Sequence, residues 1–439
     1  MYRKYGSVLP EGNRKPVFID GIRTPFAKSF GVFAETDSLE LFSRAVDGLV
    51  RKLEIDPNEL DEISAGEVAP QAQNPNVARD AIMSLGLPTH IHGFTLNQAC
   101  VSSLQTIADA AKTVVYGHPH MVLAGGVECL SNVPIPYSKE ARRFLIKMSK
   151  SRSTADRLSL LKDFSPKAWL PQSPALAEPM TGLTMGEHAE IMAKLNRISR
   201  EDQDRLALES HKKAAAAQES GKFADEIVPI WPTFGYKSCV DADNLIRRDS
   251  TLEALAQIRP AFDTEYGTLT AGNSSPLTDG AAVVLITDEA RAKSLGLKPK
   301  SRILDFVFVG VDPAEQLLIG PALAIPLLLK RNKLGLKDVD LFEIHEAFAA
   351  QVLSCLNSME SKEFCERHFG DTKAFGSIPR EKLNVNGGAL AIGHPFGATG
   401  ARLVTTLSNE LIRSNKNIGV IGVCAAGAMA CAMLVERIG

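Results

Sequence analysis

The segment Leu96-Asn97-Gln98-Ala99-Cys100-Val101-Ser102-Ser103 joins a strand-like apolar run to a helical pattern. From Ser102 onward, apolar residues recur at i, i+3, i+4 and i+7 spacing, which predicts an amphipathic helix. Cys100 therefore lies at a helix start, where unpaired N–H groups and the helix dipole stabilise a thiolate and lower the pKa of a cysteine. This position suits a nucleophile, although a free cysteine is also often just a small buried apolar residue.

The composition sets broad limits on the protein. The chain has 439 residues, a formal charge of −2 and 23% charged residues. This length predicts two domains or a fused pair, and the balanced charge gives no overall reason to bind nucleic acid. Seven scattered cysteines without a CxxC pair argue against a disulfide framework or a zinc site. They favour a reducing compartment, and we expect the cytoplasm, with the mitochondrial matrix as the alternative.

One uncharged stretch near the C-terminus has the length of a short membrane span. Residues 418–435 comprise 18 residues without a charge. They are mostly Gly, Ala, Val and Cys, and Gly427 divides them into two pieces of strand length. We therefore expect two buried strands joined by a tight turn.

Strand and helix patterns alternate along the chain, which predicts an α/β fold with helices packed on a sheet. The expected strands are residues 17–22, 60–68, 121–126, 267–270, 281–287 and 418–423, and the expected helices are 38–53, 77–85, 200–221, 288–295 and 399–413. Residues 336–346 match the pattern of 57–67, and the order from Asn386 onward repeats the order from Asn97. Two copies of one αβ unit explain the length. We place the halves at residues 1–297 and 298–439, with a loop domain inserted in the first at about 129–260.

A basic insertion interrupts the first half. Residues 139–170 hold nine basic and three acidic residues, with apolar residues interleaved among them. This pattern predicts two short amphipathic helices. A basic amphipathic pair can lie on an anionic membrane surface or dock on an acidic partner, and a merely solvated helical face is the alternative.

Four residues able to do covalent chemistry stand at or just after strand ends: Cys100, His345, His394 and Cys424. Strand ends are where α/β sheets place their sites. Each residue alone has a plain structural explanation. Together they supply a thiol nucleophile, a base for its proton and a second acid or base for deprotonating carbon.

Three longer motifs resemble those of the thiolase family. They are residues 386–400, which surround His394, residues 270–282 and residues 185–190. The resemblance implies a duplicated αβαβα layered fold and spans the chain from Arg23 to Cys424. Within the family the chain is most similar to the β subunit of the fatty acid oxidation trifunctional complex, a 3-ketoacyl-CoA thiolase. His345 stands where most thiolases have Asn, and the insertion at 139–170 points the same way.

The resemblance implies a mechanism. His394 removes the thiol proton of Cys100, and the thiolate attacks the 3-keto carbon of a 3-ketoacyl-CoA. Cleavage leaves an acyl group on Cys100, while Cys424 protonates the departing acetyl-CoA carbanion. Free CoA then takes the acyl group. No metal and no bound cofactor are implied, and coenzyme A is a substrate.

The resemblance also implies two oxyanion sites. His394 and a water held by His345 serve the thioester oxygen of acetyl-CoA. The backbone N–H groups of Cys100 and Ala426 serve the oxygen on the acylated carbon.

The family's substrate contacts and partners carry over in the same way. Ser275 matches a position that contacts the pantetheine arm of CoA, and Met185 one that lines the acyl or pantetheine pocket. The implied assembly is a homodimer acting in fatty acid β-oxidation. It is part of a multienzyme complex with an enoyl-CoA hydratase/3-hydroxyacyl-CoA dehydrogenase α subunit. For the basic residues 139–170 we expect docking on a partner subunit or a peripheral membrane contact. No nucleic acid is implied.

The chain departs from the family pattern at two places. Alanines occupy positions 426, 428 and 430 of the loop that begins at Cys424, where the family usually has glycine. From Ala428 and Ala430 we expect a distorted loop and a weakened site, because glycine there permits positive φ or close backbone approach. Ala426 matters less, because an oxyanion hole uses the backbone N–H. His188 replaces a usual threonine near the acyl pocket.

These departures leave other functions open. One is a decarboxylating condensing enzyme of the ketoacyl synthase type. Such enzymes typically use two histidines, whereas this chain has His394 and a cysteine, Cys424, which favours reversible thiolysis. A biosynthetic acetoacetyl-CoA thiolase is closer. A non-enzymatic alternative is a weakly active scaffold subunit of a multienzyme complex.

Overall fold

The structure, a computed structural model, describes residues 14–117, 120–161, 165–170, 177–232 and 239–438. Residues 162–164 of the basic insertion lie outside the described residues. The strands are β1 Pro16–Arg23, β2 Ala27–Lys28, β3 Glu62–Gly66, β4 His92–Leu96, β5 Met121–Glu128, β6 Thr278–Asp288, β7 Ser301–Gly310, β8 Leu341–Ile344, β9 Ile418–Ala425 and β10 Met429–Arg437. The larger helices of the two halves are α1 Ser38–Lys52, α2 Val77–Ser84, α3 Ser102–Tyr116, α9 Glu289–Ser294, α11 Pro321–Arg331, α12 Ala349–Glu360, α13 Lys362–Phe369 and α15 Thr399–Arg413. The remaining helices are α4 Lys139–Lys150, α5 Thr154–Leu160, α6 Met185–Leu195, α7 Arg200–Glu219, α8 Leu252–Ala256, α10 Pro313–Gln316 and α14 Ala389–Ile392.

The strands form one sheet that consists of two half-sheets. The order is β4-β3-β5-β6-β1 in the first and β7-β10-β9-β8 in the second, and β2 pairs with β6. The half-sheets meet where β1 pairs with β7, at Val17 with Arg302 and Phe18 with Ser301. Because this contact is so short, the two half-sheets can diverge and enclose a layer of helices.

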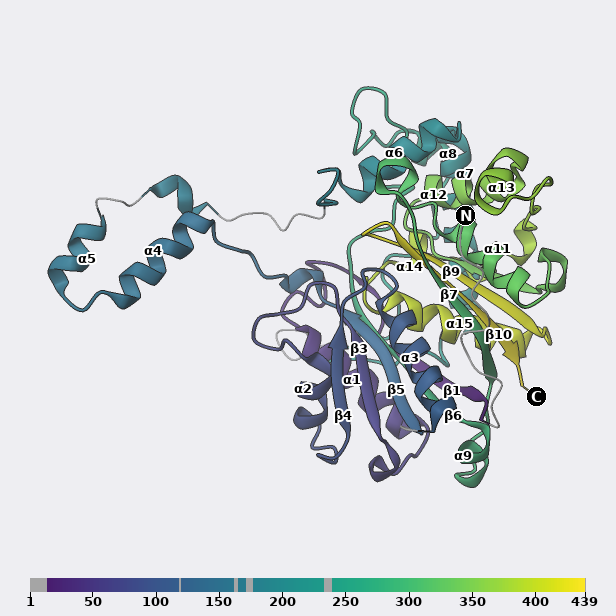
Figure 1. Cartoon of the computed structure of the whole chain (residues 1–439), viewed down its shortest axis with the longest axis horizontal. Coiled ribbons are helices and arrows are strands. Elements are labelled where there is room, and N and C mark those ends of the chain that lie inside the picture. The colour runs from purple at the N-terminus through teal and green to yellow at the C-terminus, as the bar shows by residue number, and fades with distance from the viewer. Residues whose placement is uncertain (1–13, 118–119, 162–164, 171–176, 233–238, 439) are drawn as a thin grey trace.

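The enclosed layer consists of α3 and α15. They pack on each other, α3 against β3, β5 and β6 and α15 against β1, β6 and β9. Helix α1 covers the other face of the first half-sheet, and α11 covers β7, β9 and β10 on the outside of the second (Figure 1). The αβαβα layering implied by the resemblance is therefore confirmed.

The apolar pattern explains which helix lies inside. Helix α1 buries one stripe, including Leu41, Ala45 and Leu49, and has a polar face outside. In α15 every residue from Thr399 to Leu411 is buried. A helix buried on all sides belongs in a central layer, where it faces sheet on both sides.

The two halves repeat the same local structure, as the sequence match predicts. Strands β3 and β8 each run parallel to the strand that follows the central helix of their half, β5 and β9 respectively. The Asp61 carboxylate accepts hydrogen bonds from the N–H groups of His120 and Met121. The carboxylate of Asp340, the matching residue, accepts from Asn417 and Ile418.

Most predicted elements are confirmed, including the antiparallel pair β9 and β10 in the uncharged stretch at 418–435. The strand predicted at 267–270 is wrong. Its backbone N–H groups bond to side chains instead of a neighbouring strand: Thr268 and Leu269 donate to the Glu190 carboxylate, and Thr270 donates to Asn273. In the part of the chain that the structure describes, no helix is both long and apolar enough to cross a membrane.

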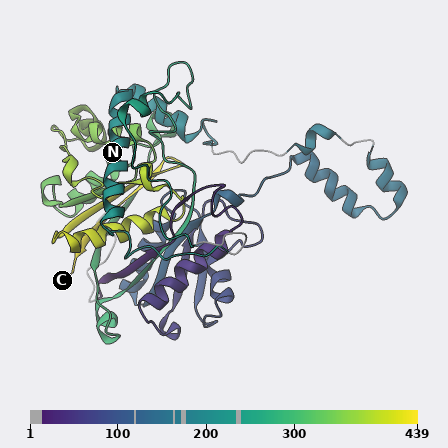
Figure 2. The same cartoon turned by 180° about the vertical axis from the view of Figure 1, so that it is seen from behind.

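The basic insertion forms helices α4 and α5, as predicted. Both views show this helical pair projecting away from the layered body (Figures 1 and 2). At the base of this helical pair, the Trp169 ring makes edge-on contacts with the rings of Tyr137 and Phe144.

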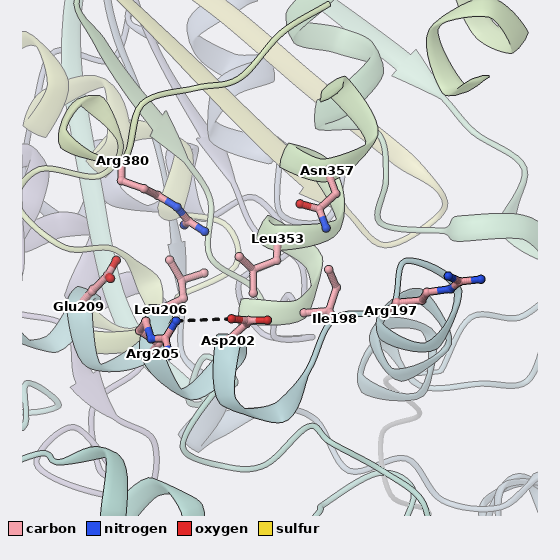
Figure 3. A pocket seen from close by; sticks show the side chains of 9 residues that line it. All are labelled: Arg197, Ile198, Asp202, Arg205, Leu206, Glu209, Leu353, Asn357 and Arg380. Carbon is pink, nitrogen blue, oxygen red and sulfur yellow. Dashed lines mark ion pairs between the residues drawn. The ribbon is translucent and has the colours of Figure 1, made fainter. Parts of the chain in front are cut away.

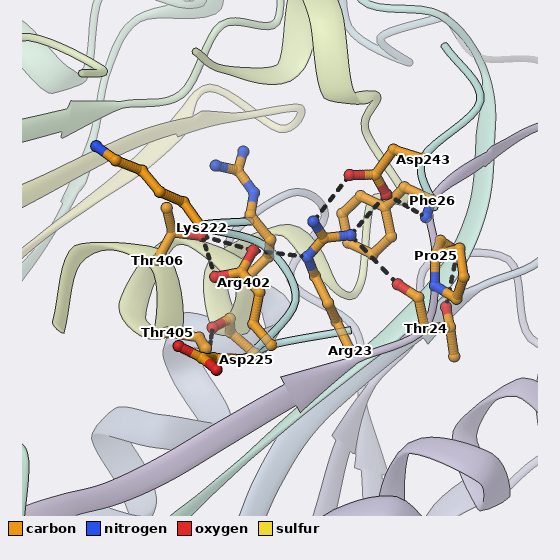
Figure 4. Close-up of polar contacts among 12 residues, drawn as sticks. Arg23, Thr24, Pro25, Phe26, Lys222, Asp225, Asp243, Arg402, Thr405 and Thr406 are labelled. Atoms are coloured by element: carbon orange, nitrogen blue, oxygen red, sulfur yellow. Dashed lines mark hydrogen bonds and ion pairs between the residues drawn. The ribbon is translucent and has the colours of Figure 1, made fainter. Parts of the chain in front are cut away.

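A buried arginine ties the end of β1 to the segments that carry Glu226 and Asp243. Arg23 donates to Glu226 at 2.9 Å and to both carboxylate oxygens of Asp243, at 2.6 and 2.8 Å (Figure 4). Glu226 also accepts from the Thr406 hydroxyl of α15. Arg23 and Glu226 therefore join the end of β1, the segments of Glu226 and Asp243, and α15 of the central layer.

Candidate active site

Cys100 lies in the turn between β4 and α3, two residues before the helix begins. Ala99 adopts a left-handed conformation with φ of 48°, which fits neither a strand nor a helix, so the chain turns sharply here. The Ser102 hydroxyl donates to the Ala99 carbonyl at 2.6 Å and accepts from the Gln98 N–H at 2.8 Å. This turn presents Cys100 at the N-terminal end of a buried helix, as predicted.

His394 meets Cys100 from the other half of the chain. Its Nε2 lies 3.2 Å from the Cys100 Sγ, and its Nδ1 lies 2.6 Å from the Thr399 hydroxyl oxygen. Thr399 donates its one hydroxyl proton to the Pro395 carbonyl at 2.8 Å, so it accepts from His394. The proton of neutral His394 is therefore on Nδ1, and Nε2 is free to take the thiol proton of Cys100.

His345 completes a buried trio. It follows β8, and its N–H donates to the Gly422 carbonyl of β9 at 2.8 Å. Its Nε2 lies 3.2 Å from Nε2 of His394, and the ligating atoms of Cys100, His345 and His394 all lie within 4.8 Å of one another. Such a trio is also a possible metal donor set, so a metal-free site stays a prediction.

Burial controls the protonation of these groups. It raises the pKa of the Cys100 thiol to about 12, although the N–H groups of Ala426 and of Cys100 itself act to lower it. Desolvation of the Cys100 thiolate therefore outweighs the lowering of its pKa that we expected from the helix start. Burial and, next, the charge of Arg402 lower the pKa of His394 to about 3. The resting pair is a neutral thiol beside a neutral imidazole, and the thiolate forms as the proton moves to His394.

Cys424 lies on β9, two residues after the Gly422 that accepts from His345. It is 1% exposed. Burial raises the pKa of the Cys424 thiol well above its usual value, and the neighbouring Cys100 raises it further. Cys424 therefore keeps its proton at neutral pH, which suits a general acid.

The turn after Cys424 is less distorted than the alanines predict. Ala430 pairs with Cys424 in the ladder of β9 and β10, a regular strand position that does not require glycine. Ala428 does adopt a left-handed conformation, with φ of 56°, which glycine would adopt more readily.

The two predicted substrate contacts, Ser275 and Met185, are not part of the trio. Ser275 is half-buried, and its N–H donates to the Ala347 carbonyl at 2.9 Å. Met185 is the first residue of α6 and packs against the core of the second half. His188, one turn later, shares a hydrogen bond of 2.7 Å with the Thr181 hydroxyl.

Sequence reasoning missed two groups, one that contacts His394 and one that joins the segments on which the two histidines lie. One is Thr399, whose only signal in the sequence is a hydroxyl five residues after His394. The other is the buried Glu346, whose carboxylate accepts from Ser210 at 2.7 Å, from Asn384 at 2.6 Å and from the Leu390 N–H at 3.2 Å. Glu346 joins the His345 segment to the loop that leads to His394.

A cavity of about 380 Å³ lies elsewhere, between α7, α12 and the turn at Arg380 (Figure 3). Its floor is apolar, with Leu206 and Leu353, and charged side chains such as Arg197 and Asp202 surround it. None of the predicted site residues lines it.

The chain matches the family profiles "Thiolase, N-terminal domain" at residues 17–290 and "Thiolase, C-terminal domain" at residues 297–437. It is 42% identical to a 3-ketoacyl-CoA thiolase of Colwellia psychrerythraea, over 95% of this chain and 96% of the relative. It is 40% identical to a 3-ketoacyl-CoA thiolase of Photorhabdus laumondii, over 99% and 100%. The crystal structure of the Bacillus anthracis acetyl-CoA acetyltransferase superimposes with a TM-score of 0.82 at 32% identity, over 98% of this chain and 100% of that one.

Proposed function

The chain belongs to the thiolase family, and we propose that it is a 3-ketoacyl-CoA thiolase, an acyltransferase that cleaves 3-ketoacyl-CoA with CoA. The observation that carries the proposal is the contact of 3.2 Å between the Cys100 Sγ and a His394 Nε2 that has no proton of its own. A thiol nucleophile next to a free base is what acyl transfer to sulfur requires.

In the proposed reaction, the thiol proton of Cys100 passes to His394 as Sγ attacks the 3-keto carbon. The Cα–Cβ bond then breaks, and the electron pair leaves on the carbanion of acetyl-CoA. The buried thiol of Cys424 supplies the proton that this carbanion needs. Free CoA attacks the acyl group on Cys100 and releases an acyl-CoA two carbons shorter.

We assign the oxyanions as the resemblance implies. The N–H groups of Ala426 and Cys100 both act to lower the pKa of the Cys100 thiol, which supports assigning them to the oxygen on the acylated carbon. For the thioester oxygen of acetyl-CoA, we assign His394 and a water held by His345. Ser275 and Met185 are assigned to the pantetheine arm and the acyl chain.

The test is CoA-dependent cleavage of a long-chain 3-ketoacyl-CoA beside acetoacetyl-CoA, with Cys100→Ala as the blank. The proposal is supported if the unaltered protein cleaves the long-chain 3-ketoacyl-CoA and the Cys100→Ala variant does not. Cleavage of acetoacetyl-CoA alone supports a short-chain biosynthetic thiolase, a second candidate that the likeness to the acetyl-CoA acetyltransferase favours. A folded protein inactive on both substrates, whose Cys100 also resists haloacetamide, supports the scaffold reading.

We further propose that the enzyme acts in fatty acid β-oxidation, in the cytoplasm, as a homodimer within a multienzyme complex. The expected partner is an enoyl-CoA hydratase/3-hydroxyacyl-CoA dehydrogenase subunit, and the mitochondrial matrix is the alternative compartment. A dimer fits the half-exposed strand β4, which pairs only with β3 among the described strands and leaves its other edge open.

For the projecting pair α4 and α5 we propose docking on the partner subunit. Its exposed leucines and isoleucines, such as Ile146 at 53% and Leu158 at 65%, stand among basic residues. Deleting residues 139–170 should leave acetoacetyl-CoA chemistry largely intact and abolish association with the partner on a sizing column. An unchanged complex would contradict this proposal, and loss of binding to anionic vesicles alone would assign the pair to a membrane surface.

A further inference from the structure

The turn between β9 and β10 holds a group that the proposed reaction needs. This turn, residues 425–428, carries the Ala426 N–H that acts on the Cys100 sulfur. Gly427 has φ of 75° and Ala428 has φ of 56°. Alanine disfavours this left-handed region, so the turn does not hold its shape by its own conformational preference.

Two hydrogen bonds from other segments hold the turn. The Val311 N–H, just after β7, donates to the Ala428 carbonyl at 2.8 Å. On the other side, Glu178 Oε2 accepts from the Gly427 N–H at 3.0 Å. Glu178 is only 7% exposed, so its carboxylate is directed inward at the turn instead of into solvent.

Glu178 is itself fixed in place. Its N–H donates to the Leu183 carbonyl and its own carbonyl accepts from the Gly182 N–H, both at 2.8 Å. Thr181, inside this tight loop, is bound to His188 of α6 at 2.7 Å. The family's usual threonine is absent at position 188, and the histidine there connects the loop to a well-capped helix.

We propose that Glu178 is a positioning residue that holds the Ala426 N–H in its oxyanion-binding direction. The Glu178 carboxylate fixes the peptide between Ala426 and Gly427, and this peptide adjoins the one that carries the Ala426 N–H. The fixed carboxylate thereby helps to hold the left-handed turn that glycines allow in the usual loop. The inference rests on the proposed function, because it concerns the acyl transfer step.

The test compares Glu178→Ala with Glu178→Gln, which keeps an oxygen acceptor of the same reach. Loss of a whole oxyanion donor costs about 10²- to 10³-fold in kcat, so a misdirected donor should cost about 10- to 100-fold. We expect Glu178→Ala to lose this much kcat in thiolysis with little change in KM for CoA. Glu178→Gln should stay within about 5-fold of the unaltered protein. Glu178→Asp keeps the charge but shortens the reach, and it should lose activity as the alanine variant does even if the latter folds poorly.

Two further measurements separate positioning from a general structural role. Alkylation of Cys100 by iodoacetamide forms no oxyanion, so Glu178→Ala should slow it far less than it slows acylation by an acyl-CoA. Ala428→Gly, which relaxes the turn, should restore part of the acylation rate in the Glu178→Ala background. Equal loss of alkylation and acylation, or no rescue, overturns the inference.

The inference and the proposed function fail in different ways. If the unaltered protein cleaves no 3-ketoacyl-CoA, the proposed function fails. If the unaltered protein is active and Glu178→Ala matches it within twofold, only the role of Glu178 fails.

Discussion

Replacing Thr399 by valine tests how the base is prepared. The hydroxyl of Thr399 accepts from Nδ1 of His394 at 2.6 Å. Because its one proton is donated to the Pro395 carbonyl, this hydroxyl can only accept from His394, which keeps the imidazole proton on Nδ1. Valine has the same shape without the hydroxyl. The Nδ1–H of His394 then loses its acceptor in a buried site, and the imidazole is free to carry its proton on Nε2, where it faces the Cys100 sulfur.

The expected loss follows from the cost of a buried donor left without a partner. That cost is about 1–3 kcal/mol, which corresponds to a fall of about 5- to 150-fold in the rate of Cys100 acylation. Thr399→Ser keeps the hydroxyl and is the matched control, expected within about threefold of the unaltered protein. The assay is the rapid formation of acyl-Cys100 from an acyl-CoA, followed by CoA-dependent turnover.

Two outcomes would refute this reasoning. If Thr399→Val acylates as fast as Thr399→Ser, the tautomer of His394 does not depend on Thr399. If both variants lose activity together with cooperative unfolding, the hydroxyl supports the start of α15 and not the base.

Three more predictions concern other buried groups. Cys424→Ala should still form the acyl-Cys100 adduct but fail to condense acetyl units, which mass spectrometry and a condensation assay check together; normal synthesis would remove Cys424 from the mechanism. Burial raises the pKa of Glu343 to about 8, although the Arg402 guanidinium 3.7 Å away acts to lower it. Arg402→Met should therefore leave Glu343 neutral and buried, and should lower the free energy of unfolding in urea by about 1–3 kcal/mol, the cost of a buried polar group without a partner; the double variant with Glu343→Leu should recover most of this. Burial lowers the pKa of His211 to about 4, so the folded state holds it neutral and stability falls as pH drops from about 6.5 towards 4. The loss at His211 amounts to about 3 kcal/mol, and His211→Gln should flatten the pH dependence of the unfolding midpoint in that range.

The elements that could be predicted are those whose apolar pattern matches their environment. The helix at 399–413 was identifiable because Leu403, Leu407 and Leu411 recur at helical spacing. Strand β7 was not predicted, because residues such as Arg302 and Asp305 interrupt its apolar run. Asp305 is nonetheless buried, and Arg331 of α11 neutralises it. A sequence pattern does not reveal which distant residue pairs with a buried charge.

The site shows the same limit. The reactive side chains, Cys100, His345, His394 and Cys424, stand in motifs with distinctive spacing and were identified in advance. Thr399 and Glu178, which orient atoms of the site, were not, because threonine and glutamate are common and their roles depend on partners far along the chain. Glu178 lies 249 residues from the Gly427 N–H that it accepts from.

The junction between the halves explains why the motif around His394 needs its glycines. A Cβ on Gly397 would come within 2.3 Å of the carbonyl oxygens of Gly66 and Val127, and one on Gly126 within 2.1 Å of the Gly397 oxygen. Three backbone segments therefore meet at van der Waals contact, which only glycine permits. Glu128 seals this junction, since its carboxylate accepts from the N–H groups of Ala69 at 2.9 Å and Gly397 at 3.1 Å.

This junction sets the distance between nucleophile and base. Cys100 precedes α3 of the first half, and His394 precedes α15 of the second, so their separation depends on how closely the two central helices approach. Gly400 lies against Leu104, where a Cβ would come within 2.7 Å of the leucine backbone nitrogen. Any side chain at this crossing would push the helices apart and lengthen the 3.2 Å contact between the Cys100 Sγ and His394. The duplicated fold thus places the nucleophile in the first half and its base in the second, and close packing of glycine at the junction brings them within reach of a proton transfer.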